Sequence, residues 1–280
     1  MIHAETGGID GESLASALTA VREREPLVQQ LTNEVTKNDL ANLTLSWGAL
    51  PVMADAPGEA PEMAELAGAI LLNTGRMTET NVEALHNAGE RANELGVPVV
   101  LDPVGVGATP TRTEVAGSLL ESVEFAAIKG NYGEVSALAG VESEVKGVES
   151  VGEYEAIEGT AAELANATGA VVVASGVEDV VSDGAESYRV HAGHERMSEV
   201  VGTGCMLGAT LAAFCGAIEE PSSASLSGTL AFGIAGERAA DLPHNGPASY
   251  RINFLDSVAN LTPEVAADLD LEGRIDPVSD

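Results

Sequence analysis

Short apolar runs that alternate with helical patterns are the feature that most constrains the fold of this chain. Four such runs end in small or polar residues, and helix-like sequence follows each of them, as in TETNVEALHNAGERANELG after the first. Continuous apolar runs joined by helical crossovers predict a parallel sheet covered by helices on both faces. The runs read GAILLNTG, VPVVLDPVG, EFAAIKGN and AVVVASG.

The flanking segments extend this pattern. Residues 12–36 have helix-like apolar spacing, while DVVSDG and SYRVHAG predict antiparallel strands at the sheet edge. From residue 202 onward the chain reads as mainly helical, with an acidic tail from about residue 263 that is expected to fray. No linker or repeat interrupts the sequence, so we expect one α/β domain over residues 1–280, a three-layer sandwich around a mostly parallel sheet.

The charge balance restricts the partners of this chain. Its formal net charge is −31, and its lysines are Lys37, Lys129 and Lys146. An acidic surface repels nucleic acid and anionic lipid, so neither is expected as a partner. The scarcity of lysine favours adaptation to a high-salt cytoplasm, where the Debye length falls to about 3 Å at 1 M salt. An acidic protein from an ordinary cell is the alternative.

The cysteines predict neither a disulfide nor a zinc site. Cys205 and Cys215 lie on one apparent helix, about 15 Å apart along its axis, whereas a disulfide needs Cα atoms within about 7 Å. No CxxC motif is present, and His191 and His194 have no paired ligands nearby in sequence. The first residues lack the pattern of a signal peptide, and the longest apolar run, of about 14 residues, is too short for a bilayer. We therefore expect a cytoplasmic protein.

Three segments carry residues suited to chemistry, and each should lie where strands end, which is where open α/β sheets bind ligands. LDPVGVGAT carries Asp102, KGNYGE carries Lys129 and Glu134, and GTGC opens a helix at Cys205. Two carboxylates suit a hydrated Mg²⁺, and a glycine-rich helix start suits phosphates. Taken singly, Asp102 could be a turn residue, Glu134 could complement a helix dipole, and Cys205 could be a small buried apolar residue.

Several stretches together resemble the hydroxyethylthiazole kinase family of the ribokinase-like superfamily, in order across about residues 27–261. They are LTNEVTKNDLANLTLSWGALPVMADAPGE, LDPVGVGATPTR, KGNYGEVSALAG, VVGTGCMLGATLAAF and GPASYRINFLDSV. The resemblance implies a ribokinase-like fold and ATP-dependent, magnesium-assisted phosphorylation of 4-methyl-5-(2-hydroxyethyl)thiazole on its primary hydroxyl. It also implies a homotrimer with sites near subunit interfaces.

The resemblance assigns two residues to the thiazole and one to catalysis. Met53 of PVMA and Gly202 of GTGC match substrate contacts, and Cys205 matches the catalytic position. Related sugar kinases carry aspartate there, where it takes the proton of the attacking hydroxyl. We expect the helix N-terminus to lower the pKa of the Cys205 thiol below about 8.5, so that the thiolate accepts this proton without forming a covalent intermediate. The backbone amides of Gly202, Thr203 and Gly204 would form an anion hole.

The remaining matches concern the metal and the nucleotide. Asp102 and Glu134 fall on the magnesium positions of the family, and Lys129 and Ser175 fall where it usually has an ATP-contacting arginine and threonine. Lysine cannot form the bidentate fork that arginine makes with phosphate. Two alternatives remain: a ribokinase-like NAD(P)H-hydrate dehydratase, for which aspartate after GTG and no PVMA are expected, and a non-catalytic thiazole or nucleotide sensor.

Overall fold

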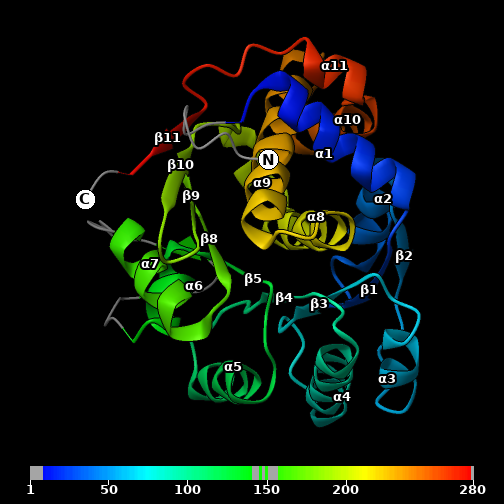
Figure 1. Cartoon of the computed structure of the whole chain (residues 1–280), viewed down its shortest axis with the longest axis vertical. Coiled ribbons are helices and arrows are strands. Elements are labelled where there is room, and N and C mark those ends of the chain that lie inside the picture. The colour runs from blue at the N-terminus through cyan, green and yellow to red at the C-terminus, as the bar shows by residue number, and fades with distance from the viewer. Residues whose placement is uncertain (1–8, 141–144, 147–148, 151–156, 279–280) are drawn as a thin grey trace.

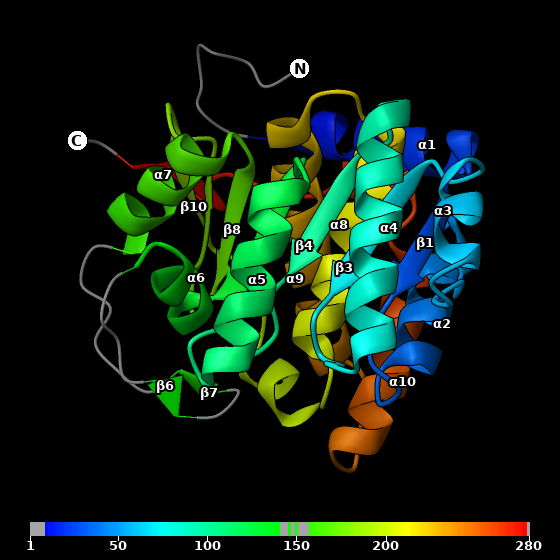
Figure 2. The same ribbon diagram turned by 90° about the horizontal axis from the view of Figure 1, so that it is seen from below.

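A nine-stranded sheet lies between two layers of helices in this protein (Figures 1 and 2). The computed structural model describes residues 9–140, 145–146, 149–150 and 157–278. Within them the strand order is β11-β10-β9-β8-β5-β4-β3-β1-β2, and neighbouring strands are parallel from β8 to β2 and antiparallel from β11 to β8. The predicted α/β three-layer sandwich with a mostly parallel sheet is thus confirmed.

The strands are short, and the parallel ones at the centre are buried on both faces. In chain order they are β1 (Leu27–Leu31), β2 (Leu50–Val52), β3 (Ala69–Asn73), β4 (Val99–Asp102), β5 (Ala127–Asn131), β8 (Val171–Ser175), β9 (Asp179–Ser182), β10 (Ser187–Val190) and β11 (Ile275–Pro277). A separate pair, β6 (Val145–Lys146) and β7 (Glu149–Ser150), is antiparallel. The four apolar runs of the sequence form β3, β4, β5 and β8, and the predicted antiparallel edge is present as β9 and β10.

The helices form two layers, each with its own hydrophobic core (Figure 1). One layer contains α1 (Gly11–Arg24), α2 (Lys37–Trp47), α8 (Thr203–Ala217), α9 (Pro221–Asp241), α10 (Pro247–Asn260) and α11 (Pro263–Ala267). The other contains α3 (Glu59–Ala64), α4 (Glu79–Leu95), α5 (Pro110–Ser122), α6 (Tyr132–Leu138) and α7 (Ile157–Thr168). Figure 2 shows α4 and α5 in front of the strands, with α8 and α9 behind them.

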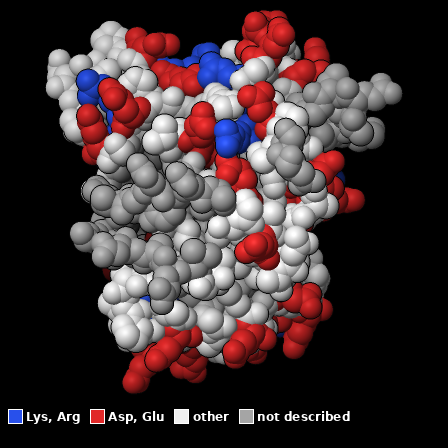
Figure 3. Space-filling view, turned by 90° about the vertical axis from the view of Figure 1, so that its left-hand side faces the viewer, with Lys and Arg blue, Asp and Glu red and all other residues white. Residues whose placement is uncertain are grey.

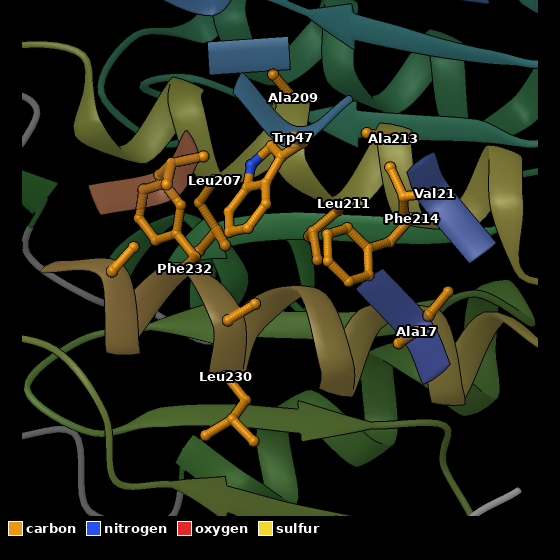
Figure 4. Close-up of a cluster of buried hydrophobic side chains, with 14 of the residues drawn as sticks. Ala17, Val21, Trp47, Leu207, Ala209, Leu211, Ala213, Phe214, Leu230 and Phe232 are labelled. Carbon is orange, nitrogen blue, oxygen red and sulfur yellow. The ribbon is translucent and has the colours of Figure 1, made fainter. Parts of the chain in front are cut away.

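Helix α8 is buried along nearly its whole length, which fixes the position of its N-terminus. Gly208 allows the close approach to the sheet, because a Cβ there would lie 3.2 Å from Leu71 Cδ1. On the other side, the Phe214 and Trp47 rings pack edge to face with centroids 5.6 Å apart, and Trp47 Nε1 donates to Thr210 Oγ1 at 2.9 Å (Figure 4). Both cysteines lie on this one helix as unpaired thiols, as predicted.

The helix predicted over residues 12–36 is wrong in its second half. Helix α1 ends at Arg24, because Glu25 adopts a left-handed conformation (φ 42°) and Pro26 cannot continue the hydrogen-bond pattern. Residues 27–31 instead form β1, between β2 and β3. The acidic tail, for which fraying was expected, forms α11 and then β11, which pairs with β10.

The surface carries the acidity seen in the sequence. On the face drawn in Figure 3, Asp and Glu atoms are spread widely and the few Lys and Arg atoms lie against them. In the part of the chain that the structure describes, none of the helices is long and apolar enough to cross a membrane.

Candidate active site

The candidate active site lies where β3, β4 and β5 end, beneath the first turn of α8. Asn73 and Asp102 are the last residues of β3 and β4 and are paired in register, and Lys129 lies on β5. Helix α8 contacts all three strands, and Cys205 is in its first turn. Because the parallel strands end at one edge, residues distant in sequence meet here, as the sequence predicted.

A buried ion pair forms the centre of the site. Lys129 Nζ lies 3.3 Å from Asp102 Oδ1, and the two side chains are 5% and 0% exposed. Burial alone would lower the pKa of Lys129, but the negative charges of Asp102 and Glu134 raise it above its ordinary value. The lysine is therefore charged, which places a cation at the sheet edge beneath α8.

The side chain of Asn73 links the carboxylate to the thiol. Its Nδ2 donates to Asp102 Oδ2 at 2.6 Å and to Cys205 Sγ at 3.2 Å. Asn33, near the start of the loop that follows β1, also directs its Nδ2 toward Cys205 Sγ, at 3.8 Å. The sequence reasoning missed both asparagines, although Asn73 ends an apolar run in the same way as Asp102 does.

The pKa expected for Cys205 is wrong. Burial, followed by the nearby Asp102 carboxylate, raises the pKa of the thiol to about 12. Lys129 and the Asn73 amide act in the opposite direction but do not reverse the shift. The prediction considered only the helix N-terminus, whereas Cys205 is a residue only 9% exposed that lies close to a carboxylate. Cys205 is therefore a protonated thiol at neutral pH.

Glu134 has a structural role in addition to any role with a metal. It forms a capping box with Asn131 at the start of α6, in which its Oε2 accepts the Asn131 N–H at 2.8 Å. Its Oε1 accepts the Gly105 N–H at 2.7 Å, which ties the loop after β4 to α6. Burial, the largest cause, raises the pKa of the Glu134 carboxyl.

The described residues contain no cluster of three or more His, Cys, Asp or Glu side chains that could hold a metal ion by themselves. Asp102 and Glu134 still offer hard oxygen atoms, and each oxygen keeps a lone pair beyond the hydrogen bond it accepts. Two carboxylates fit an Mg²⁺ that is held mainly by substrate phosphates and water, which is the usual arrangement for this ion.

The glycines at the start of α8 have steric reasons to be glycine. Gly202 has φ 92°, and a Cβ there would lie 2.6 Å from Thr36 Cγ2. A Cβ on Gly204 would lie 3.0 Å from Lys129 Nζ. Helix N-termini leave N–H groups that favour anions, and here a buried lysine lies beside them. Of the three amides expected to form an anion hole, that of Thr203 already donates to Val200 O at 3.4 Å. Backbone N–H groups and a charged lysine thus lie side by side at the start of α8, with the Asp102 carboxylate next to the lysine.

Met53 and Ser175 lie toward opposite ends of the same sheet edge. Met53 follows β2 directly and packs against the hydrophobic core of the layer that contains α2 and α8. Ser175 ends β8, where its Oγ donates to Gly130 O at 3.3 Å. Five strand intervals separate β2 from β8, which is about 24 Å at the usual spacing. The ion pair and Cys205 lie on the strands and helix between them.

The fold and this cluster together define a protein of the ribokinase-like class. The sequence profile of the hydroxyethylthiazole kinase family matches residues 18–264. A relative described as hydroxyethylthiazole kinase from Natronomonas pharaonis is 50% identical over 268 residues, 95% of each chain. Another of that description, from Haloquadratum walsbyi, is 47% identical and covers 94% of this chain and 92% of its own. The chain therefore belongs to the hydroxyethylthiazole kinase family, which confirms the predicted family and the prediction of a kinase.

Solved structures agree with this assignment. A hydroxyethylthiazole kinase protein from Pyrococcus horikoshii has a TM-score of 0.84 and 38% identity, with 95% of this chain and 99% of that chain covered. An ADP/ATP-dependent NAD(P)H-hydrate dehydratase from Bacillus subtilis has a TM-score of 0.60 at 17% identity, covering 85% and 90%. That second likeness shows the shared fold alone.

Proposed function

We propose that this protein transfers the γ-phosphoryl group of ATP to the primary hydroxyl of 4-methyl-5-(2-hydroxyethyl)thiazole. The observation that carries the proposal is the buried cluster of Lys129, Asp102 and Cys205 at the N-terminus of α8, in a chain of this family. Phosphoryl transfer depends mainly on positioning and on neutralising charge, and this cluster supplies both a fixed cation and helix N–H groups.

The two substrates would lie along the sheet edge in opposite directions from Cys205. The thiazole would lie toward β2, against the Met53 thioether, which suits a neutral sulfur heterocycle, and beside Gly202. ATP would extend toward β8, with Ser175 contacting the nucleotide. Lys129 and the amides of Gly202 and Gly204 would contact the transferring phosphate, and the Thr203 amide would join them if it released Val200 O. A bound Mg²⁺, held by Asp102 and Glu134, would supply charge neutralisation on the phosphates.

Cys205 would accept the proton of the attacking hydroxyl. Because the thiol is itself protonated, its own proton would pass to the Asp102 carboxylate as the hydroxyl proton reaches the sulfur. The N–H groups of Asn73 and Asn33 face the sulfur and would hold it in place for this transfer. No bond between sulfur and phosphorus is needed.

Product analysis tests this proposal. The purified protein is incubated with ATP, MgCl₂ and the thiazole alcohol in molar KCl, and ³¹P NMR is used to follow the phosphate ester and ADP. We expect both to appear in equal amounts. Binding of the thiazole without ester formation would instead support the sensor, and ATP-dependent conversion of NADH hydrate without ester formation would support the dehydratase.

We further propose a homotrimer whose sites lie near subunit interfaces. Val35 and Val201 are 74% and 76% exposed. They directly precede Thr36 and Gly202, the two residues at which the loop before α2 approaches the start of α8. Exposed apolar side chains beside a site suit coverage by a second subunit. Sedimentation equilibrium in molar KCl should report three chains, and a fully active monomer would contradict this assembly.

The cellular setting is a proposal as well. A halophilic source is supported by the net charge of −31 and by the two similar relatives from Natronomonas pharaonis and Haloquadratum walsbyi. We place the protein in the cytoplasm, where its phosphate donor is made, as one domain over residues 1–280.

A further inference from the structure

The segment that carries Met53 is held in place by side chains from three other elements. This segment, residues 53–60, runs from the end of β2 into α3, and we call it the Met53 segment. Gln29 of β1 binds its backbone at two carbonyls, Lys37 of α2 pairs with Asp55 at 2.5 Å, and Asn87 of α4 donates to Pro57 O at 3.1 Å. The position of Met53 therefore depends on contacts outside its own segment.

Gln29 is the buried member of these three. Its Nε2 donates to Ala54 O at 2.9 Å and to Ala60 O at 3.0 Å, so both N–H bonds of the amide are used on the Met53 segment. The side chain is fully buried, and its Oε1 has no hydrogen-bond partner among the described residues. A buried unpaired acceptor is unfavourable, and an apolar residue would avoid it. The unpaired Oε1 of Gln29 therefore lowers the stability of the fold, and the two hydrogen bonds that Nε2 donates offset this loss.

The two bonds bracket the segment close to Met53. Ala54 follows Met53 directly, Ala60 lies in the first turn of α3, and Gln29 is paired in register with Val52, the last residue of β2. The Lys37–Asp55 pair is about one quarter exposed on each side, so salt weakens it. Burial protects the Gln29 bonds from such screening, which matters for a chain proposed to work in molar salt.

We propose that Gln29 is a positioning residue that fixes the backbone beside Met53 and thereby sets the affinity for the acceptor alcohol. The inference rests on the proposed function, because it takes Met53 as a contact of the thiazole. A side chain with this role changes binding of one substrate and not of the other. ATP lies toward β8 in the proposed arrangement, so its binding is not expected to depend on Gln29.

The neighbouring Gln30 provides a matched control. It has the same side chain, is also fully buried on β1, and also has an unpaired Oε1. Its Nε2 donates to Thr44 Oγ1 of α2 at 2.6 Å, because successive strand residues face opposite sides of the sheet. Among the described residues, none of the hydrogen bonds of the Gln30 side chain reaches the Met53 segment. Substituting Gln30 therefore measures the general effect of losing a buried amide from β1.

The experiment compares Gln29→Met with Gln30→Met in molar KCl. Thiazole and ATP affinities are measured by calorimetry, alongside KM, kcat and the melting temperature. We expect Gln29→Met to weaken thiazole binding and raise its KM by about tenfold, with ATP affinity changed less than about twofold. Gln30→Met should lower the melting temperature comparably and leave thiazole affinity within about twofold. Unchanged thiazole affinity in Gln29→Met, or equal weakening in both variants, would overturn the proposal.

Two further variants separate possible failures. If Gln29→Met does not fold, Gln29→Asn keeps an amide that is one methylene too short to reach both carbonyls. It should weaken thiazole binding in the same direction, and wild-type affinity would overturn the proposal. Met53→Ala tests the underlying assignment: unchanged thiazole affinity there contradicts the proposed substrate placement, whereas weaker binding in Met53→Ala but not in Gln29→Met contradicts the role of Gln29 alone.

Discussion

Lys129 Nζ lies 3.3 Å from Asp102 Oδ1 in a site where both side chains are almost completely buried. Removing one charge of such a pair leaves the other without compensation, which typically costs about 3–5 kcal/mol. We expect Lys129→Met to lower the free energy of unfolding by about this amount and to raise the KM for ATP. Urea denaturation and steady-state kinetics measure the two effects.

The matched variant is Lys129→Arg, which keeps the charge. Its planar fork can bind two phosphate oxygens, so the KM for ATP should fall or stay unchanged if this position faces the nucleotide. If the lysine only pairs with Asp102, both variants should change stability without changing the KM for ATP.

Cys205→Asp should keep substantial turnover, because a carboxylate can accept the hydroxyl proton from nearly the same place. Cys205→Ala should lower kcat by about 10²-fold with little change in the KM for the thiazole, as expected when a proton acceptor is lost. If Cys205 only fills the core, Ala would be tolerated and the buried Asp would lower the melting temperature. Wild-type kcat in the Ala variant would remove Cys205 from the mechanism.

Asp179, which begins β9 beyond Ser175, predicts a pH dependence of stability. Burial raises the pKa of its carboxyl from 3.8 to about 7, although the Gly176 N–H and Lys129 act in the opposite direction. A raised folded-state pKa means that the folded state binds the proton more tightly. The resulting stabilisation is complete below pH 3.8 and is lost as the pH rises through about 7.

The variant that tests this is Asp179→Asn, which keeps an acceptor for the Gly176 N–H. It should raise the melting temperature relative to the unsubstituted protein at about pH 8, and the difference should shrink toward about pH 5. An identical difference at both pH values would show that Asp179 does not titrate in this range.

Salt should be needed for folding and activity. With a formal charge of −31, carboxylate repulsion is screened only when the Debye length is short. We expect the melting temperature to be more than about 5 °C higher in about 2 M KCl than in about 0.1 M KCl. Sucrose in place of the added KCl controls for general solute effects, and equal melting temperatures at the two salt concentrations would exclude the screening account.

The sequence predicted those parts of the fold that depend on local pattern. The apolar residues that begin β3, β4, β5 and β8 indicate buried strands. Asp102 and Lys129 could be placed because each lies at or near a strand end. Strand β1 was not predicted, because Gln29 and Gln30 interrupt its apolar run and because Leu27 and Leu31 have helical spacing. Pro26 was the available signal against a continuous helix.

The pKa of Cys205 could not be predicted from local sequence patterns. The helix N-terminus around Cys205 is a local feature and favours a lower thiol pKa. Burial under α8 and the approach of Asp102 are tertiary features, and they dominate. Asn73 and Asn33 likewise gain their importance only when the folded chain brings them to the same sulfur atom.

The measurement that tests the central claim most directly is a comparison of kcat/KM for three alcohols with ATP in molar KCl. The alcohols are 4-methyl-5-(2-hydroxyethyl)thiazole, hydroxymethylpyrimidine and ribose, and ADP formation is followed with a coupled assay. A kinase whose acceptor contacts Met53 and Gly202 should prefer the thiazole over either of the others by at least about 10²-fold. Preferential turnover of hydroxymethylpyrimidine or ribose would contradict the substrate assignment, and no ADP formation with any of them would contradict the kinase.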